Sequence, residues 1–245
     1  MMNSPVSTMK SPMYNNDKNP TTGQYWRIVR TIIWKDINIE MRKKTLVSAL
    51  LIFSVMVTLI FTFALDLDKS TRDNVAVGVL WVTFVFASTL GLNQTFANEK
   101  NHRSLEGMLL SPIDHTAIFV GKFISTYIFV IIIEIIIIPM FYILYGIPLF
   151  SPLFLLIVLL GSFGYTLVGT LLTSIAIRTQ VREIMLPILL FPVSMPIIIA
   201  SVQCSNAILS GANWGQFSNA FNLVLVYDII FMGVAIMTFD YLIQE

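Results

Sequence analysis

Six long, mostly apolar runs constrain this chain more than any other feature of its sequence. A helix of about 20 apolar residues can cross the roughly 30 Å hydrocarbon core of a bilayer. Only 12% of the residues are charged, whereas soluble domains usually contain about 25%. We therefore expect an all-α integral membrane protein, with a transmembrane domain over residues 46–241. The six predicted spans are 46–65, 75–97, 121–145, 153–177, 184–202 and 221–239.

Basic residues are distributed unevenly between the two ends of these spans. Residues 1–45 contain eight Lys or Arg, residues 98–122 contain three, and residues 178–183 contain two. The opposite side carries only Lys69 and Arg72. Because cytoplasmic loops are enriched in Lys and Arg, this bias places both termini in the cytoplasm. The sequence thus predicts a multi-pass membrane protein.

Two segments precede the first span. Residues 1–22 are polar and lack the apolar core of a signal peptide, so we expect a disordered tail. Residues 23–45 predict an amphipathic helix in the membrane interface, with Trp26 and Trp34 as headgroup anchors. An ordinary cytoplasmic helix leading into the first span is the alternative. The predicted polar stripe is Arg27, Thr31, Lys35, Asn38 and Arg42, and the apolar face is Trp26, Val29, Ile33 and Ile37.

The connection between the second and third spans is unusually polar. Residues 98–112, NEKNHRSLEGMLLSP, place Arg103 four residues after Glu99 and three before Glu106. Pairs at these spacings stabilise a helix, and Pro112 ends it. Leu105 and Leu109 lie on another side of that helix. An exposed apolar patch beside charges suits the docking of a cytoplasmic partner, although a solvated turn that merely joins two spans is the alternative.

Motifs for nucleotide hydrolysis or other catalysis are missing from the sequence. The stretch VGKF at 120–123 lacks the glycine spacing and the hydroxyl of a phosphate-binding loop. There is no Ser/His/Asp arrangement and no metal-ligand cluster, and Cys204 is the only cysteine. A net charge of +1 argues against a nucleic-acid binder. We expect a non-catalytic subunit, with any energy supplied by another polypeptide or by an ion gradient.

Polar residues within the spans are candidate functional residues. Glu134 and Asp228 lie in the third and sixth spans without a basic residue at similar depth. A membrane-embedded carboxyl is costly when charged, so we expect both to be mostly neutral. They serve either in packing or in a proton relay or gate. Ser162, Thr166 and Thr170 recur at four-residue intervals in the fourth span, which fits close helix packing or, alternatively, a hydrophilic path.

Two stretches of the chain, residues 96–123 around this connection and residues 185–201, resemble a known family. Residues 185–201, MLPILLFPVSMPIIIAS, are similar to that family's proline-spaced fifth span. The family is the haem exporter protein B family (CcmB), the membrane subunit of the cytochrome c maturation ABC transporter. The resemblance covers about residues 24–241 and departs at KNHR, where members usually have Asp-Gly. The matching residues around the connection are Phe96, Glu99, Ser104, Leu105, Glu106, Leu109, Leu110, Pro112 and Lys122.

This resemblance implies an ABC-2-like permease half of the bacterial inner membrane that forms a homodimer and recruits ATP-binding subunits. It also implies haem-handling cytochrome c maturation membrane proteins as partners, with ATP used only by the partner ATPase. Residues 98–112 would be the coupling helix seated in a cleft of that ATPase. The ATPase-coupling residues would be Glu99, Arg103, Ser104, Leu105, Glu106 and Leu109.

Durable haem binding is not expected from the residues of this chain. Its two histidines, His102 and His115, both lie on the predicted cytoplasmic side, away from the interior of the bundle. Haem is therefore a candidate transported species rather than a bound cofactor, and we expect no metal site. The alternatives are an ABC-2 permease for a lipid, drug or polysaccharide precursor, a proton-coupled carrier using Glu134 and Asp228, and a non-transporting scaffold.

Overall fold

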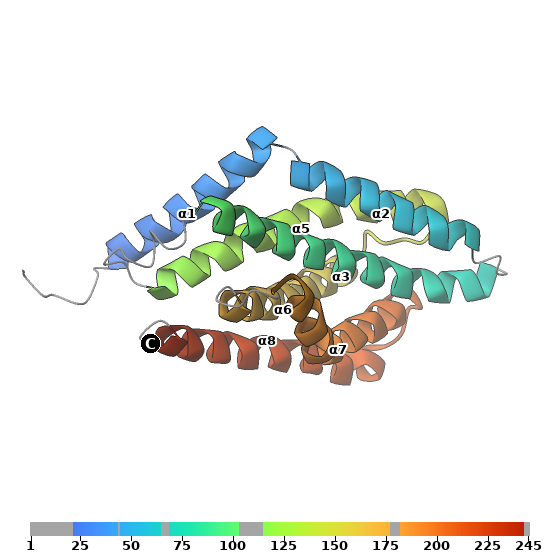
Figure 1. Ribbon diagram of the computed structural model, residues 1–245. Coiled ribbons are helices and arrows are strands. Elements are labelled where there is room, and N and C mark those ends of the chain that lie inside the picture. The colour runs from blue at the N-terminus through green and yellow to red at the C-terminus, as the bar shows by residue number, and fades with distance from the viewer. Residues whose placement is uncertain (1–21, 44, 65–68, 103–114, 177–181, 243–245) are drawn as a thin grey trace, which may run out of the picture.

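The computed structural model describes residues 22–43, 45–64, 69–102, 115–176 and 182–242, and these ranges contain helices and no strand. All six predicted spans are confirmed, since six helices are long and apolar enough to cross a membrane. The protein is an all-α integral membrane protein (Figure 1). Its helices are α1 (Thr22–Lys43), α2 (Thr45–Ala64), α3 (Lys69–His102), α5 (His115–Tyr145), α6 (Pro152–Ala176), α7 (Arg182–Leu209) and α8 (Trp214–Leu242).

Helix α6 is the centre of the bundle and packs against α3, α5, α7 and α8. Three of its glycines leave space for side chains of neighbouring helices. A Cβ on Gly161 would overlap Trp81 of α3, and one on Gly169 would overlap Leu92 of the same helix. On Gly164 it would overlap Asp228 of α8. Because small residues allow membrane helices to approach closely, these glycines determine how tightly α6 is surrounded.

Compact turns join the helices at the end away from α1. Gly146, directly after α5, and Gly211, after α7, have φ values of 69° and 70°, which glycine adopts without steric cost. Ser151 caps α6, because its hydroxyl accepts a hydrogen bond from the backbone N–H of Phe154 at 3.2 Å. Pro152 follows at the first helical position, where no backbone donor is needed. The short turn predicted at residues 146–152 is confirmed.

Three prolines lie inside α7, at positions 187, 192 and 196. Each removes a backbone hydrogen-bond donor and crowds the preceding turn, which favours a kink. Figure 1 shows that α7 is bent, in agreement with the kinking expected from its prolines.

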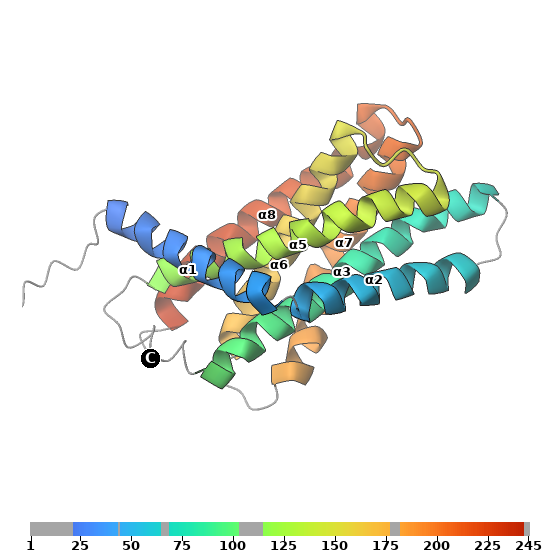
Figure 2. The same cartoon turned by 90° about the horizontal axis from the view of Figure 1, so that it is seen from above.

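Helix α1 lies across one end of the bundle, beside the start of α5 (Figure 2). Its buried face contains Val29, Ile32 and Asp36, whereas Ile33 is only half-buried. The face that meets the protein is thus rotated from the apolar face expected from the sequence. Trp26 and Trp34 are 59% and 70% exposed, so both side chains remain available to lipid. The placement of α1 in the membrane interface stays a prediction, and residues 1–21 of the predicted tail lie outside the described residues.

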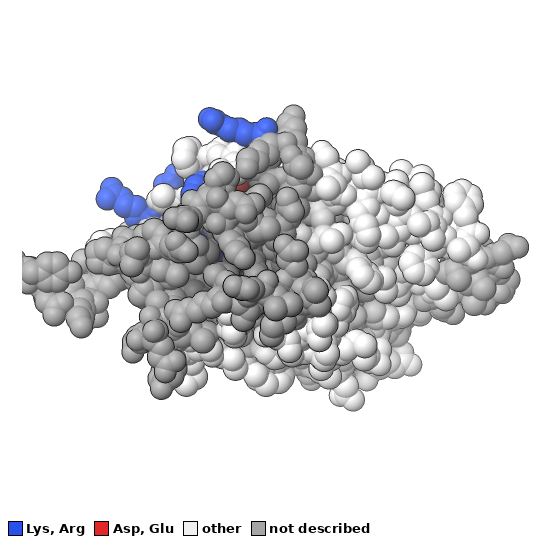
Figure 3. Space-filling model, in the orientation of Figure 1, with Lys and Arg blue, Asp and Glu red and all other residues white. Residues whose placement is uncertain are grey.

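The basic side chains that the structure describes lie near one end of the bundle. Among the side chains that the structure describes, every Lys and Arg belongs to α1 or to the first turns of α5. Figure 3 shows these basic groups over α1, whereas the described surface at the opposite end is uncharged. The outer faces of the spans are apolar; Phe63 of α2 and Ile229 and Met237 of α8 are more than two-thirds exposed. Such a surface suits contact with lipid chains rather than water.

Candidate functional site in the polar core of the bundle

The predicted ATPase-coupling residues lie at the junction of α3 and α5. Helix α3 continues to His102, five residues beyond the predicted end of the second span, so Glu99 belongs to its last turn. Its side chain is not among those described. The remaining residues of this set lie outside the described residues, so the role of residues 98–112 stays a prediction; they are Arg103, Ser104, Leu105, Glu106 and Leu109.

Glu134 lies in the interior of the bundle, with only 2% of its surface exposed. The hydroxyl of Ser162 on α6 is beside its carboxyl. That hydroxyl, however, donates to the backbone carbonyls of Val158 at 2.8 Å and Leu159 at 3.3 Å. Within the described part of the chain, neither carboxyl oxygen of Glu134 has a hydrogen-bond partner. A buried carboxyl in such surroundings is far less costly when it is neutral.

Tyr127 lies on the same face of α5, two turns before Glu134. Its hydroxyl donates to the backbone carbonyl of Leu159 on α6 at 2.8 Å. Its ring packs edge-on against Phe163, with centroids 5.6 Å apart. Tyr127 therefore joins α5 to α6 close to the level of Glu134.

Asp228 is 7% exposed and lies over Gly164, at the contact between α8 and α6. The missing side chain at Gly164 lets this carboxyl reach the backbone of α6. Ile197 of α7 fills the other side of the same space. The oxygens of Asp228 also have no hydrogen-bond partner among the described residues. Glu134 and Asp228 thus both approach α6, one beside Ser162 and the other over Gly164, two residues further along that helix.

The hydroxyl residues of α6 are buried, but most bond within their own helix. Ser162, Thr170 and Ser174 each donate to the backbone carbonyl four residues earlier, at 2.8 Å. Thr166 is also buried, and its hydroxyl has no partner in the described residues. Because these hydroxyl protons are used by the α6 backbone, the residues contribute mainly as small, tightly packed side chains. Their role in transport stays a prediction.

Tyrosine and tryptophan side chains form hydrogen bonds between helices, and none of these residues was predicted from the sequence to do so. Trp81 of α3 donates to Ser205 of α7 at 3.0 Å. The hydroxyls of Thr89 and Tyr165 lie 2.6 Å apart and join α3 to α6. Buried Tyr and Trp usually find such partners, but which helix supplies the partner is not evident from the sequence.

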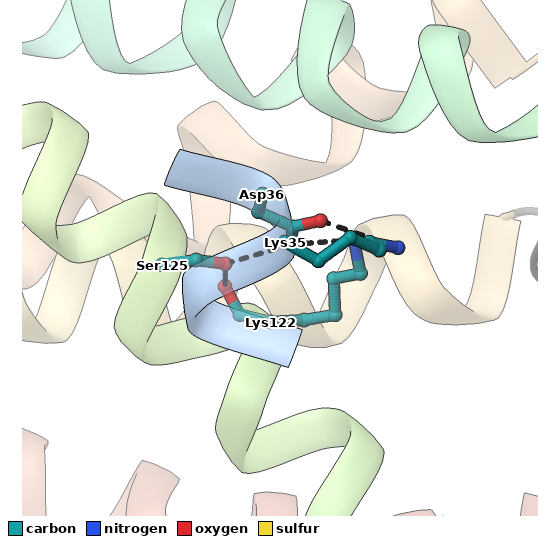
Figure 4. A network of polar contacts seen from close by, with 4 residues as sticks. All are labelled: Lys35, Asp36, Lys122 and Ser125. Carbon is teal, nitrogen blue, oxygen red and sulfur yellow. Dashed lines mark hydrogen bonds and ion pairs between the residues drawn. The ribbon is translucent and has the colours of Figure 1, made fainter. Parts of the chain in front are cut away.

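A second set of polar contacts, between α1 and the first turns of α5, was also not predicted from the sequence. Lys122 donates to Oδ2 of Asp36 on α1 at 2.7 Å, and the Ser125 hydroxyl is 3.1 Å from the same oxygen (Figure 4). Lys35 approaches the other oxygen of Asp36 at 3.3 Å. Lys122 and Asp36 are only 3% and 8% exposed. Lys122 belongs to the family motif, but no partner for it could be predicted from the sequence.

The described residues contain no group of three or more His, Cys, Asp or Glu side chains that could hold a metal ion. His102 ends α3 and His115 begins α5, both at the end of the bundle where α1 lies. Cys204 is buried, and its sulfur is 3.8 Å from the backbone carbonyl of Phe217.

Comparison with protein families places this architecture in a known group. The family model described as CcmB protein matches residues 27–241, from the first turns of α1 to the end of α8. The chain belongs to the CcmB family. That family assignment confirms the resemblance found in the sequence, which covers about residues 24–241.

Individual relatives are distant but cover much of the chain. It is 24% identical over 162 residues to Heme exporter protein B of Pseudomonas aeruginosa, which covers 66% of this chain and 73% of that protein. With Heme exporter protein B of Rhodobacter capsulatus it shares 23% identity over 176 residues, 71% of this chain and 81% of the other. The protein of that name from Escherichia coli K12 is 24% identical over 98 residues, 40% of this chain and 43% of its own length.

Proposed function

We propose that this CcmB-family chain is the membrane subunit of an ABC transporter that acts in haem export or delivery for cytochrome c maturation. A partner ATPase hydrolyses ATP, and this subunit converts that hydrolysis into a conformational change across the inner membrane. The observation that carries the proposal is the family match over residues 27–241, which spans α1 and all six crossings. The relatives named Heme exporter protein B support haem as the transported species.

The proposed orientation places both termini and residues 98–115 in the cytoplasm. The excess of Lys and Arg in residues 1–45, 98–122 and 178–183 over the opposite side of the spans supports it. In that orientation the predicted coupling residues face an ATPase, and the uncharged turns at 146–151 and 210–213 face outward. A homodimer of this chain with two ATP-binding subunits and haem-handling membrane partners completes the proposed assembly.

The ATPase partner is tested by affinity capture from membranes that contain the full-length chain. Leu105→Ala and Glu106→Lys are expected to reduce the captured ATPase at least tenfold while leaving the amount of the membrane protein unchanged. Leu223→Ala is the matched control, because Leu223 is exposed on α8, away from the predicted coupling segment. Capture of no ATPase by the unmodified chain would contradict the proposal.

The substrate is tested by deleting the gene and measuring covalently attached haem in c-type cytochromes. We expect cytochrome c to fall to background and to return when the gene is supplied again. Normal cytochrome c in the deletion strain would point to an ABC-2 permease for another substrate, such as a lipid, a drug or a polysaccharide precursor.

One observation favours a second candidate, a proton-coupled carrier. Glu134 and Asp228 are buried at mid-span, and their oxygens have no hydrogen-bond partner in the described residues. Carboxyls of this kind occur in proton relays. Transport in proteoliposomes that follows an imposed pH gradient without an ATPase, and that is lost in Glu134→Gln, would support this candidate over the first.

A further inference from the structure

The stretch VGKF, residues 120–123, forms the contact between α5 and α1. Gly121 faces Ile32 of α1 so closely that a Cβ on the glycine would lie 3.0 Å from the Cβ of Ile32. The next residue, Lys122, donates to Asp36 one turn further along α1, at 2.7 Å. One residue thus allows the two helices to approach, and the following residue pairs a charge across them.

Burial makes this ion pair hard to separate. With Lys122 and Asp36 almost fully buried, moving α1 away from α5 would leave a charge in an apolar environment. Breaking a buried pair is strongly unfavourable, because the remaining charge is uncompensated. Ser125 adds a further restraint, since its hydroxyl is within donating distance of both Asp36 Oδ2, at 3.1 Å, and the Lys122 carbonyl, at 3.0 Å (Figure 4).

The position of the pair connects it to the proposed coupling segment. Helix α5 begins at His115, directly after residues 103–114. Lys122 follows seven residues later, about 10 Å along the axis at 1.5 Å per residue. Helix α1 is therefore attached to the part of α5 nearest the segment proposed to meet the ATPase, and Val29 and Ile32 bury an apolar face against this part of the bundle.

We propose that Asp36, Lys122 and Ser125 are positioning residues that join α1 and the cytoplasmic half of α5 into one rigid unit, which moves as a whole when the ATPase acts on the connection before α5. The inference rests on the proposed function, because it concerns how a conformational change in the ATPase is transmitted to the membrane spans. It gives α1 a mechanical role in addition to lying at the membrane surface.

The first test separates charge pairing from other effects of mutation. Asp36→Lys and Lys122→Asp are each introduced alone and then together, in the full chain with its partner proteins. We expect each single variant to lower cytochrome c at least tenfold and the double variant to recover most of the loss, because opposite charges again face each other. Ser125→Ala is expected to lower it about twofold. Wild-type cytochrome c in either single variant, or no recovery in the double variant, would overturn the inference.

The second test asks whether α1 and α5 move together. Ile32→Cys and Gly121→Cys are combined in a Cys204→Ala background. The two Cβ atoms would lie 3.0 Å apart, about half an ångström below the shortest Cβ separation usual in disulfides, so a small adjustment of the helices allows the bond. The purified complex in nanodiscs is oxidised with copper phenanthroline and its ATP hydrolysis is measured. We expect the cross-linked complex to keep at least half of its activity, and the cross-link to restore activity to the Asp36→Asn variant.

The outcomes distinguish this inference from the proposed function. Loss of ATP hydrolysis on cross-linking, reversed by a reductant, would mean that α1 must move relative to α5 and would overturn the inference alone. Failure of the two cysteines to cross-link would contradict the close approach and overturn it as well. If the unmodified chain captures no ATPase, the proposed function fails, and this inference fails with it.

Discussion

Three buried carboxyls divide this molecule into two kinds of environment. Asp36, on α1, is paired with Lys122 and lies within 3.1 Å of the Ser125 hydroxyl. Glu134 and Asp228, in the middle of the spans, have no hydrogen-bond partner among the described residues. The same chemical group is thus compensated at the end of the bundle where α1 lies and uncompensated at its centre.

We attribute the difference to the position of each carboxyl along the spans. Near the surface a long Lys side chain can enter the bundle and neutralise a carboxylate without placing a charge at the midplane. At the centre an ion pair would require the desolvation of two charges, whereas a neutral carboxyl costs much less. We therefore expect Asp36 to act as a charge and the two central carboxyls to act as neutral polar groups.

The largest effect is expected from breaking the compensated pair. Lys122→Met leaves Asp36 buried without its closest cation, so the free energy of unfolding should fall by about 3–5 kcal/mol. Lys35→Met is the matched control. Lys35 is more exposed and 3.3 Å from Asp36, so its loss should cost under about 1 kcal/mol. Both values are measured by SDS titration in mixed micelles. Equal effects of the two variants would contradict the special role of Lys122.

A smaller effect is expected where Asp228 meets α6. Gly164→Ala places a Cβ against the Asp228 carboxyl and the Ile197 side chain, so overpacking should cost about 1–3 kcal/mol in the same titration. Gly233→Ala on α8 has nothing within 4 Å of the new Cβ. It should be neutral or should stabilise the helix by up to about 1 kcal/mol. A neutral Gly164→Ala would mean that α8 does not approach α6 as closely as described.

Loss of a hydrogen bond between two uncharged side chains should lower the free energy of unfolding by less than either of these changes. Tyr165→Phe removes the 2.6 Å contact with Thr89, and hydrogen bonds between membrane helices contribute about 0.6–1.7 kcal/mol. Tyr142→Phe is the control, since Tyr142 is exposed on α5 and its hydroxyl should matter little. If both substitutions have the same effect on unfolding, the bond between α3 and α6 makes no net contribution.

The smallest effect is expected at Glu134. If its carboxyl is neutral, Glu134→Gln preserves size and polarity, and the free energy of unfolding should change by less than about 0.5 kcal/mol. Cytochrome c levels should also be unchanged. Loss of cytochrome c with normal stability would instead assign Glu134 a proton-transfer role. Asp36→Asn is the contrasting carboxyl-to-amide substitution, because it leaves the buried Lys122 without its negatively charged partner.

Much of the fold follows from local properties of the sequence. Hydropathy located all six spans, although helix α5 of the third span begins at His115, several residues earlier than predicted. The fifth span ends later than predicted, at Leu209, and the sixth begins earlier, at Trp214. Apolar length is a sum over neighbouring residues and needs no knowledge of other helices. The turn at 146–151 was predictable for the same reason, since Gly146 and Pro152 each favour one local conformation.

The candidate sites were predictable only in part. Glu134 and Asp228 stood out because carboxyls are rare within membrane spans. The surroundings of Asp228 could not be predicted, because Gly164, which it contacts, belongs to another helix. Lys122 was visible in a motif, but its partner Asp36 is 86 residues away in the chain. The apolar face of α1 was misplaced because the sequence does not show that Asp36 is buried, which its ion pair with Lys122 allows.

The sequence by itself determined the number of crossings, their apolar character and the end of the bundle that carries the basic residues, because these depend on the transfer of consecutive residues into lipid. Only the tertiary structure decided which side chains meet: Asp36 with Lys122, Asp228 with Gly164, and Tyr165 with Thr89. Those pairings depend on how each helix is rotated and how closely it approaches its neighbours. These properties arise from packing between distant segments, which local hydropathy does not contain.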